Sequence, residues 1–184
     1  GTYPVQIGFS DFGDNTAQQG RDGYSSDGVG AANANGVEVI YSMGDFKAHV
    51  SASDTNDRVA AYGAYTMSGW TLALGIQDSN DTDDTEYVAT VGGTIGAATV
   101  SLAYAENGTA VADDAAGSRT VLAASFPVGA ATTIDAYYAD DEALDSSVGI
   151  GFHHSLGGGV TLQGGIGENF AGDTTADFGV TFNF

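Results

Sequence analysis

Most of the chain beyond Gly36 alternates between apolar residues and small or polar ones. A repeat of two is typical of β-strands whose two faces lie in different surroundings. The clearest stretch is the last one, ADFGVTFNF. One of its faces carries only apolar side chains and the other only small or polar ones: Ala176, Phe178, Val180, Phe182 and Phe184 against Asp177, Gly179, Thr181 and Asn183. This pattern predicts a strand with one face in an apolar medium.

The same alternation predicts eleven strands, joined by connections that are short and long in turn. The expected strands are residues 37–43, 46–53, 59–67, 70–77, 87–95, 99–106, 119–128, 132–139, 146–156, 160–167 and 176–184. The short connections are tight turns such as Ser68-Gly69, as expected for β-hairpins. The long connections hold most of the acidic residues. Residues 1–36 show little periodicity and are rich in turn-forming and acidic residues, so we expect one long loop there.

Short turns at one end and long polar loops at the other are typical of outer-membrane β-barrels. Strands of about eight to ten residues, tilted by about 40°, span the apolar band of such a barrel, which is about 25 Å tall. Aromatic residues gather near the strand ends, where amphipathic rings favour the membrane interface: Tyr41, Tyr65, Trp70, Tyr87, Tyr104, Tyr138 and Phe184. The sequence therefore predicts an all-β, transmembrane antiparallel β-barrel, with residues 37–184 as its strands.

Composition narrows the alternatives. The chain has 24 Asp and Glu against 4 Lys and Arg, and the net charge of -20 excludes nucleic-acid binding through phosphates. There is no cysteine, and therefore no disulfide or thiolate site. No apolar run is long enough for a transmembrane helix. A water-soluble β-sandwich would show the same alternation, but the face opposite its core would carry charge, whereas here the charge lies in the loops.

The number of predicted strands is odd, whereas single-chain bacterial barrels close with an even number. The first and last predicted strands both run from a long connection toward the short-turn end, so they would meet in parallel. An open edge would leave backbone groups unpaired in lipid. We therefore expect an odd number of antiparallel strands of the same barrel in front of Gly1.

The ordered hairpins resemble the C-terminal part of the general-diffusion porins of purple (alphaproteobacterial) bacteria. The resemblance lies in LGGGVTLQGGIG with the acidic loop and DFGVTFNF that follow it, and in VEVIYSMGDFKAHVSASD, and it spans essentially the whole chain. The terminal Phe184 is similar to the aromatic end by which outer-membrane barrels are recognised for insertion. Such porins have sixteen strands, form homotrimers and lie in the Gram-negative outer membrane beside lipopolysaccharide. The resemblance implies that this chain holds strands six to sixteen.

In these porins the third loop folds into the pore and narrows it, and the resemblance implies that role for residues 1–36. Acidic residues of the loop then face basic residues of the wall. The pore constriction expected here combines both kinds: Asp11, Asp14, Asp22, Asp27, Lys47, His49, Arg58 and Arg119. Family members also bind calcium through loop carboxylates, which makes Asp11 and Asp14 candidate calcium ligands, although no EF-hand spacing is present.

Three functions remain open from the sequence. The first is a channel for passive diffusion of ions and small hydrophilic solutes, with no required cofactor and a preference for cations that follows from the excess of carboxylates. The second is a soluble, calcium-binding extracellular β-sandwich or adhesin-like module. The third is an enzyme, but His49, His153 and His154 lack a spacing that supports catalysis, so we expect none.

Overall fold

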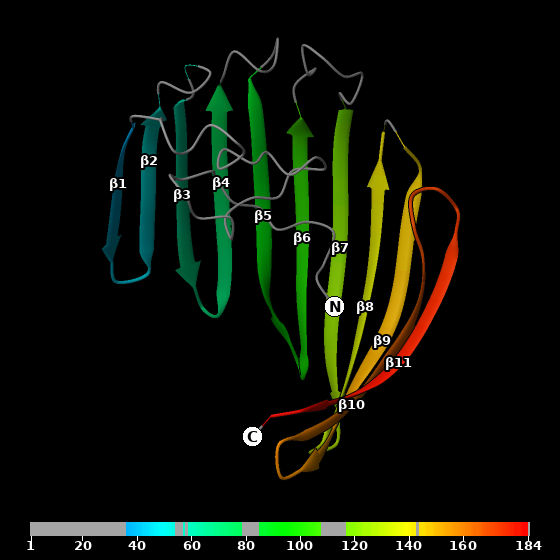
Figure 1. The fold of residues 1–184 in the computed structure, drawn as a ribbon. Helices are drawn as coiled ribbons and strands as arrows, with labels where there is room; N and C mark the ends of the chain where they lie inside the picture. Colours follow the sequence, from blue (N-terminus) through cyan, green and yellow to red (C-terminus); the bar gives the residue numbers. More distant parts are fainter. Residues whose placement is uncertain are drawn as a thin grey trace.

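The computed structural model describes residues 36–53, 57, 59–78, 85–107, 117–142 and 144–183. These residues form one antiparallel sheet in which the eleven strands follow each other in chain order (Figure 1). The strands are β1 (Gly36–Met43), β2 (Phe46–Ser53), β3 (Val59–Met67), β4 (Trp70–Asp78), β5 (Glu86–Ile95), β6 (Ala98–Asn107), β7 (Gly117–Val128), β8 (Thr132–Asp141), β9 (Ser146–Gly157), β10 (Val160–Glu168) and β11 (Thr174–Phe182). All the strands predicted from the alternation are confirmed, with ends within two residues of those expected.

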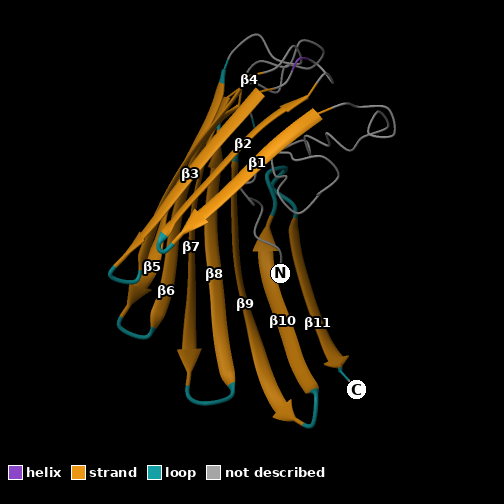
Figure 2. Cartoon of the chain, turned by 90° about the vertical axis from the view of Figure 1, so that its left-hand side faces the viewer, coloured by secondary structure: helices purple, strands orange, loops and turns teal. Residues whose placement is uncertain are grey.

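The sheet is curved, so that it has a concave and a convex face (Figures 1 and 2). The tight turns all lie at one end of the strands, as expected for alternating short and long connections (Figure 2). Strands β1 and β11 are the two edges of the sheet and run in the same direction (Figure 2). No helix among the described residues is long and apolar enough to cross a membrane.

The convex face is apolar along its whole width. Large side chains of this face are exposed, and the two with the highest exposed fractions are Leu74 at 67% and Phe178 at 69%. Phe152 and Phe178 lie on either side of Gly164, with ring centroids 6.3 Å apart. A soluble protein does not maintain so large an exposed apolar surface. The described strands form a single layer with no second sheet packed against this face, so the β-sandwich alternative is not supported.

Tyrosines mark the convex face near the long-connection end. The rings of Tyr87 and Tyr104, on neighbouring strands, have centroids 6.1 Å apart. The hydroxyl of Tyr104 donates a hydrogen bond of 2.6 Å to Glu106, and that of Tyr138 donates one of 3.3 Å to Asp140. A ring that contacts apolar neighbours and a hydroxyl that reaches a carboxylate suit the boundary between lipid and water. This arrangement agrees with the aromatic positions expected from the sequence.

Several acidic residues assigned to loops from the sequence lie in strands instead. Strand β5 begins at Glu86, and β8 continues to Asp141. The connection between β10 and β11 is also shorter than predicted, because β11 begins at Thr174. There the Asn169 side chain accepts hydrogen bonds of 2.9 Å from the backbone N–H groups of Ala171 and Asp173. This bonding closes a compact turn where the sequence suggested an extended acidic loop.

The turn between β9 and β10 depends on glycine. Gly157, Gly158 and Gly159 all have positive φ, and Gly159 has φ +80°. A Cβ at Gly159 would collide with the carbonyl oxygen of Asn183, whose N–H donates a 2.8 Å hydrogen bond to the Gly159 carbonyl. Replacing this residue therefore combines backbone strain with a steric clash.

We expect Gly159→Ala to destabilise the protein by about 2 kcal/mol or more, since the left-handed conformation alone costs about 1–2 kcal/mol. Gly44→Ala is the matched control, because Gly44 has φ +57° but nothing lies within 4 Å of the added methyl group. Urea unfolding of the protein in detergent measures both. Equal losses for the two variants would show that the contact with Asn183 contributes nothing.

Candidate functional site

The concave wall is the candidate functional surface. The buried apolar side chains described on it all come from β3 to β8 and are all Ala or Val: Ala60, Ala64, Ala73, Val88, Val121, Ala123 and Ala139. Buried polar side chains accompany them near the long-connection ends of the strands: Gln77, Glu86, Arg119, Asp141 and Ser147. Small residues with a few placed polar groups are typical of a barrel interior and differ from the bulky convex face.

Arg119 and Asp141 form a buried ion pair on this wall. The guanidinium of Arg119 donates through Nε and Nη2 to Oδ2 of Asp141, and both distances are 2.8 Å. The side chains are 6% and 0% exposed. Phe170, from the connection between β10 and β11, places its ring 4.7 Å from Cζ of Arg119. The compact turn at Asn169 thus reaches a strand that is not its neighbour in the sheet, through a cation–π contact.

A second polar contact lies on the same wall between β4 and β5. Gln77 Nε2 donates a 2.7 Å hydrogen bond to Glu86 Oε2, and both residues are 7% exposed. They are backbone partners in the antiparallel register, which brings the two side chains to the same face. The carboxylate therefore contributes negative charge to the wall close to the long-connection end.

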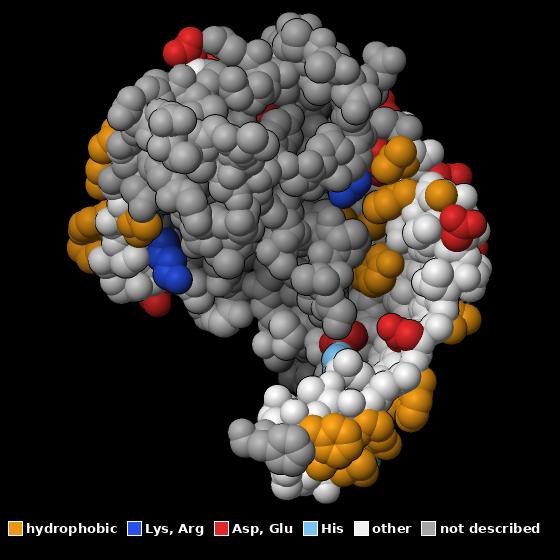
Figure 3. All heavy atoms as spheres, viewed as in Figure 1, with side chains coloured by type: hydrophobic (Ala, Val, Ile, Leu, Met, Phe, Trp, Pro, Cys, Tyr) orange, Lys and Arg blue, Asp and Glu red, His pale blue; other side chains and the backbone are white. Residues whose placement is uncertain are grey.

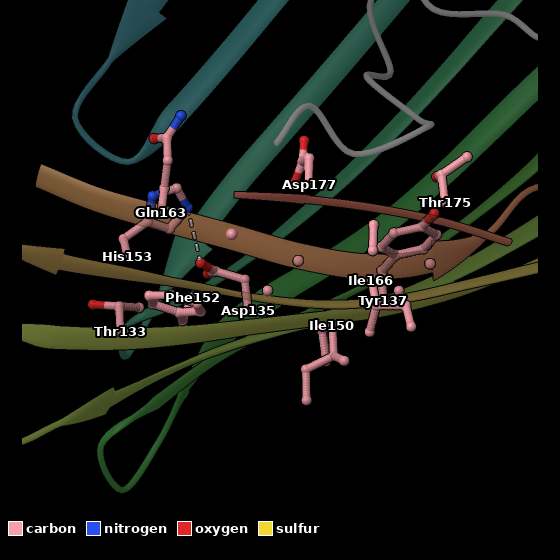
Figure 4. Close-up of a pocket in the computed structure, with 17 residues that line it drawn as sticks. Thr133, Asp135, Tyr137, Ile150, Phe152, His153, Gln163, Ile166, Thr175 and Asp177 are labelled. Carbon is pink, nitrogen blue, oxygen red and sulfur yellow. Dashed lines mark ion pairs between the residues drawn. The ribbon is translucent and has the colours of Figure 1, made fainter. Parts of the chain in front are cut away.

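The concave face of β8 to β11 forms a recess of about 670 Å³ (Figure 4). Its floor is made of glycines that pair across two strands, Gly149 with Gly167 and Gly151 with Gly165. Around them stand polar side chains: Thr133, Asp135, Tyr137, His153, Gln163, Thr175 and Asp177. Ile150 projects to the opposite side of the sheet (Figure 4). In the space-filling view, acidic and histidine side chains show on the concave side of the lower part, and apolar side chains line its outer rim (Figure 3).

Side-chain contacts hold three of these polar residues, Asp135, Tyr137 and His153. His153 Nε2 lies 3.4 Å from Asp135 Oδ2 (Figure 4). The Tyr137 hydroxyl is 3.0 Å from Ser147 Oγ, which donates a 2.7 Å hydrogen bond to the Glu168 carbonyl. The Tyr137 ring covers Gly149, where an added Cβ would come within 2.5 Å of the ring. The ring is thereby held flat against the wall.

The residues expected at the constriction are not all described. Asp11, Asp14, Asp22, Asp27 and Arg58 lie outside the described residues, as do residues 1–35 generally and Phe184. The assignment of residues 1–36 to a constriction loop, and of Phe184 to insertion, therefore stays a prediction. No group of metal-ligating side chains occurs among the described residues, and the calcium prediction for Asp11 and Asp14 falls outside them.

The described members of the expected constriction lie on the concave face, but on strands that are far apart in the sheet. Lys47 is exposed and His49 half-buried on β2, whereas Arg119 is on β7. Arg119 is buried against Asp141 and does not present an uncompensated charge to the interior. Its role in a constriction stays a prediction, as do those of Lys47 and His49.

Sequence reasoning missed the acidic residues of the wall as candidate site residues. The alternation puts Asp135 and Asp177 on the concave side, and their position in this alternation is the signal that could have identified them. Glu86 and Asp141 were missed because they were assigned to loops, whereas Glu86 is the first residue of β5 and Asp141 the last of β8. The described wall thus carries Glu86, Asp135, Asp141 and Asp177 against Lys47 and Arg119.

An all-antiparallel curved sheet with an apolar outer face, a tyrosine belt and a small, polar inner face defines a transmembrane β-barrel protein. Comparison with known proteins agrees. Residues 2–174 match the family described as Gram-negative porin, and the chain belongs to this family. It is 32% identical over 210 residues to the porin of Fuscovulum blasticum, covering 100% of this chain and 68% of that protein. Porins of this family lie in the Gram-negative outer membrane, and this chain is therefore an outer-membrane protein.

Solved structures show the same fold. A triple mutant of Rhodopseudomonas blastica porin matches with a TM-score of 0.69 and 23% identity, over 95% of this chain and 64% of that one. A second solved chain, described as "Asymmetric conductivity of engineered proteins", matches with a TM-score of 0.70 and 25% identity, over 95% of this chain and 64% of that one. This chain thus spans 64% of the length of each of these two solved chains.

Proposed function

We propose that the protein is part of a water-filled outer-membrane channel for passive diffusion of ions and small hydrophilic solutes. The observation that carries this proposal is the contrast between the two faces of one curved sheet. The convex face exposes large apolar side chains, whereas the concave face carries small and polar ones. Membership in the Gram-negative porin family supports the same function. The channel needs no chemistry from the protein.

We further propose that the channel prefers cations. The described wall carries more carboxylates than cationic side chains, and the only described arginine on it is paired with Asp141. The whole chain has a net charge of -20. Rings of carboxylates favour cations in channels because they replace part of the lost hydration with electrostatic attraction.

The selectivity of the channel tests this proposal. In a planar bilayer with a KCl gradient, we expect a reversal potential of the sign that indicates K⁺ passing more readily than Cl⁻. The double substitution of Asp11 and Asp14 by Asn is expected to shift that potential toward zero, since it removes carboxylates expected at the constriction. Gln18→Asn, which leaves the charge unchanged, is the control. An anion-selective wild type would overturn the cation preference, and an unchanged potential in the double variant would remove these two residues from it.

A homotrimer in contact with lipopolysaccharide is the assembly that we propose, on the basis of the porin resemblance. A trimer of channels opens and closes in conductance steps that occur in groups of three. Native mass spectrometry of the protein extracted from outer membranes should give three copies with bound lipopolysaccharide. A monomer as the only species would contradict the assembly but not the channel.

A further inference from the structure

We propose that the turn between β10 and β11 folds into the long-connection mouth of the channel and narrows it, an inference that rests on the proposed channel function. Phe170 is the positioning residue that holds the turn in place. The attachment of the turn at its tip and the burial of the wall beneath that tip both support this arrangement.

The tip of the turn is attached to a distant strand. The Phe170 ring lies 4.7 Å from Cζ of Arg119 on β7, and β8 and β9 separate β7 from β10. Three strand spacings of about 4.8 Å correspond to about 14 Å along the wall. Arg119 shares the concave face with Val121 and Ala123, so the turn reaches it on the inner side of the curved sheet. A segment that crosses this inner side occupies part of the opening.

The base of the turn is attached as well. Ser147 Oγ on β9 donates a 2.7 Å hydrogen bond to the carbonyl of Glu168, where β10 ends. Within the turn, the Asn169 N–H donates a 3.0 Å hydrogen bond to the Asp173 carbonyl, and the Gly172 N–H donates one of 3.0 Å to the Asn169 carbonyl. With the base held on β9 and the loop closed on itself, the Phe170 contact sets how far the tip leans over the wall.

The wall beneath the tip is buried although it faces the interior of the barrel. Five residues on two neighbouring rungs of β7 to β9 form this covered patch, and each is at most 6% exposed: Arg119, Val121, Ala139, Asp141 and Ser147. Small side chains on a concave wall can be shielded by their neighbours. A guanidinium and a carboxylate that face a water-filled lumen stay dry only beneath a cover. Phe170, whose ring lies over the guanidinium, belongs to that cover.

The ring and the narrow mouth are linked through this contact. A cation–π contact is stronger when it is desolvated, and the covered patch provides that condition. Without the ring, the tip loses its attachment to β7 and moves away from the wall. This movement admits water to the covered patch and widens the mouth. Bulky solutes benefit from the wider mouth, whereas small solutes pass in either case.

The first test is the labelling rate of a thiol placed in the covered patch, in protein reconstituted into lipid vesicles. Ala139→Cys introduces this thiol into a chain that has no cysteine. We expect Phe170→Ala to speed its reaction with a charged methanethiosulfonate about tenfold, the change in population expected for losing a desolvated cation–π contact. Phe170→Tyr keeps the ring and should leave the rate unchanged. Ser101→Cys is the matched control, because Ser101 is already exposed on the concave wall and should label equally fast with either residue at position 170.

The second test is the size of the solutes that enter. The same vesicles are allowed to swell in arabinose, a monosaccharide, and in raffinose, a trisaccharide. Phe170→Ala should raise the ratio of the raffinose rate to the arabinose rate, because the turn no longer narrows the mouth. Phe170→Tyr should restore the ratio of the native protein, a rescue that a general loss of stability would not produce.

An unchanged labelling rate in Phe170→Ala would overturn the proposal, and so would equal acceleration at Ser101→Cys, since the whole wall would then have loosened. If Ala139→Cys does not insert, Val121→Cys gives the same readout from the same covered patch. Faster labelling with an unchanged swelling ratio would refute the narrowing of the mouth. Vesicles of the native protein that do not swell even in arabinose would refute the channel itself.

Discussion

Arg119→Ala is expected to destabilise the protein by about 3–5 kcal/mol, the cost of leaving a buried carboxylate without its ion-pair partner. The Asp141 side chain is 0% exposed and receives hydrogen bonds of 2.8 Å from two nitrogens of Arg119. Removing the guanidinium also removes the cation that Phe170 covers at 4.7 Å. The measurement is the free energy of urea unfolding in detergent, followed by the fluorescence of Trp70.

A double substitution separates the ion pair from the packing. Arg119→Met with Asp141→Leu removes both charges and keeps the volume roughly constant, and buried pairs replaced in this way are often neutral in stability. We therefore expect the double variant to recover most of the stability lost in Arg119→Ala. A loss in Arg119→Ala below about 1 kcal/mol, the typical value for an exposed pair, would mean that water reaches Asp141.

Phe170→Leu tests the third member of this cluster. It keeps an apolar side chain on the turn but removes the ring, so we expect a smaller loss, of about 0.5–1 kcal/mol or somewhat more because the pair is buried. The hydrogen bonds that close the turn come from Asn169 and the backbone, and they are unaffected. The comparison shows how much of the turn's position depends on the ring.

The alternation of residues was sufficient to predict the strands and their faces. It assigned Phe178 to the outer face and Asp177 to the inner one, and the structure agrees. It did so because a β-strand has a fixed period of two, whatever its neighbours. The tight turns could be predicted from the sequence equally well, since Ser68-Gly69 and the glycines at 157–159 adopt backbone conformations that few other residues adopt.

Contacts between strands that are distant in sequence could not be read from the alternation. Phe170 and Arg119 meet although β8, β9 and β10 separate their positions in the sheet, and only the curvature of the wall and the shape of the Asn169 turn bring them together. The burial of Asp141 was missed for a related reason. The sequence DDEALD is typical of a loop. Asp141 nevertheless belongs to β8, where it pairs with Arg119 on the neighbouring strand.

Phe178→Lys tests the most basic conclusion, that the convex face lies in lipid. Phe178 is near the middle of β11 and 69% exposed, and a lysine near the middle of a lipid-facing strand costs about 2–4 kcal/mol. The lost contact with the Phe152 ring adds about 0.5–1.5 kcal/mol, and Phe178→Leu measures that part separately. Gly179→Lys is the matched control on the same strand, because it faces inward and nothing lies within 4 Å of its added Cβ.

The unfolding of these variants in lipid vesicles distinguishes a lipid-facing from a water-facing surface. If the convex face contacts lipid, Phe178→Lys loses several kcal/mol while Gly179→Lys stays close to the wild type, because the inner side of the wall is hydrated. On a water-exposed face an exposed lysine costs almost nothing, so Phe178→Lys would then lose no more than Phe178→Leu does. Residues 178 and 179 are adjacent but lie on opposite sides of the sheet, so the difference in stability that remains after the Phe152 contact is subtracted through Phe178→Leu measures the medium on each side.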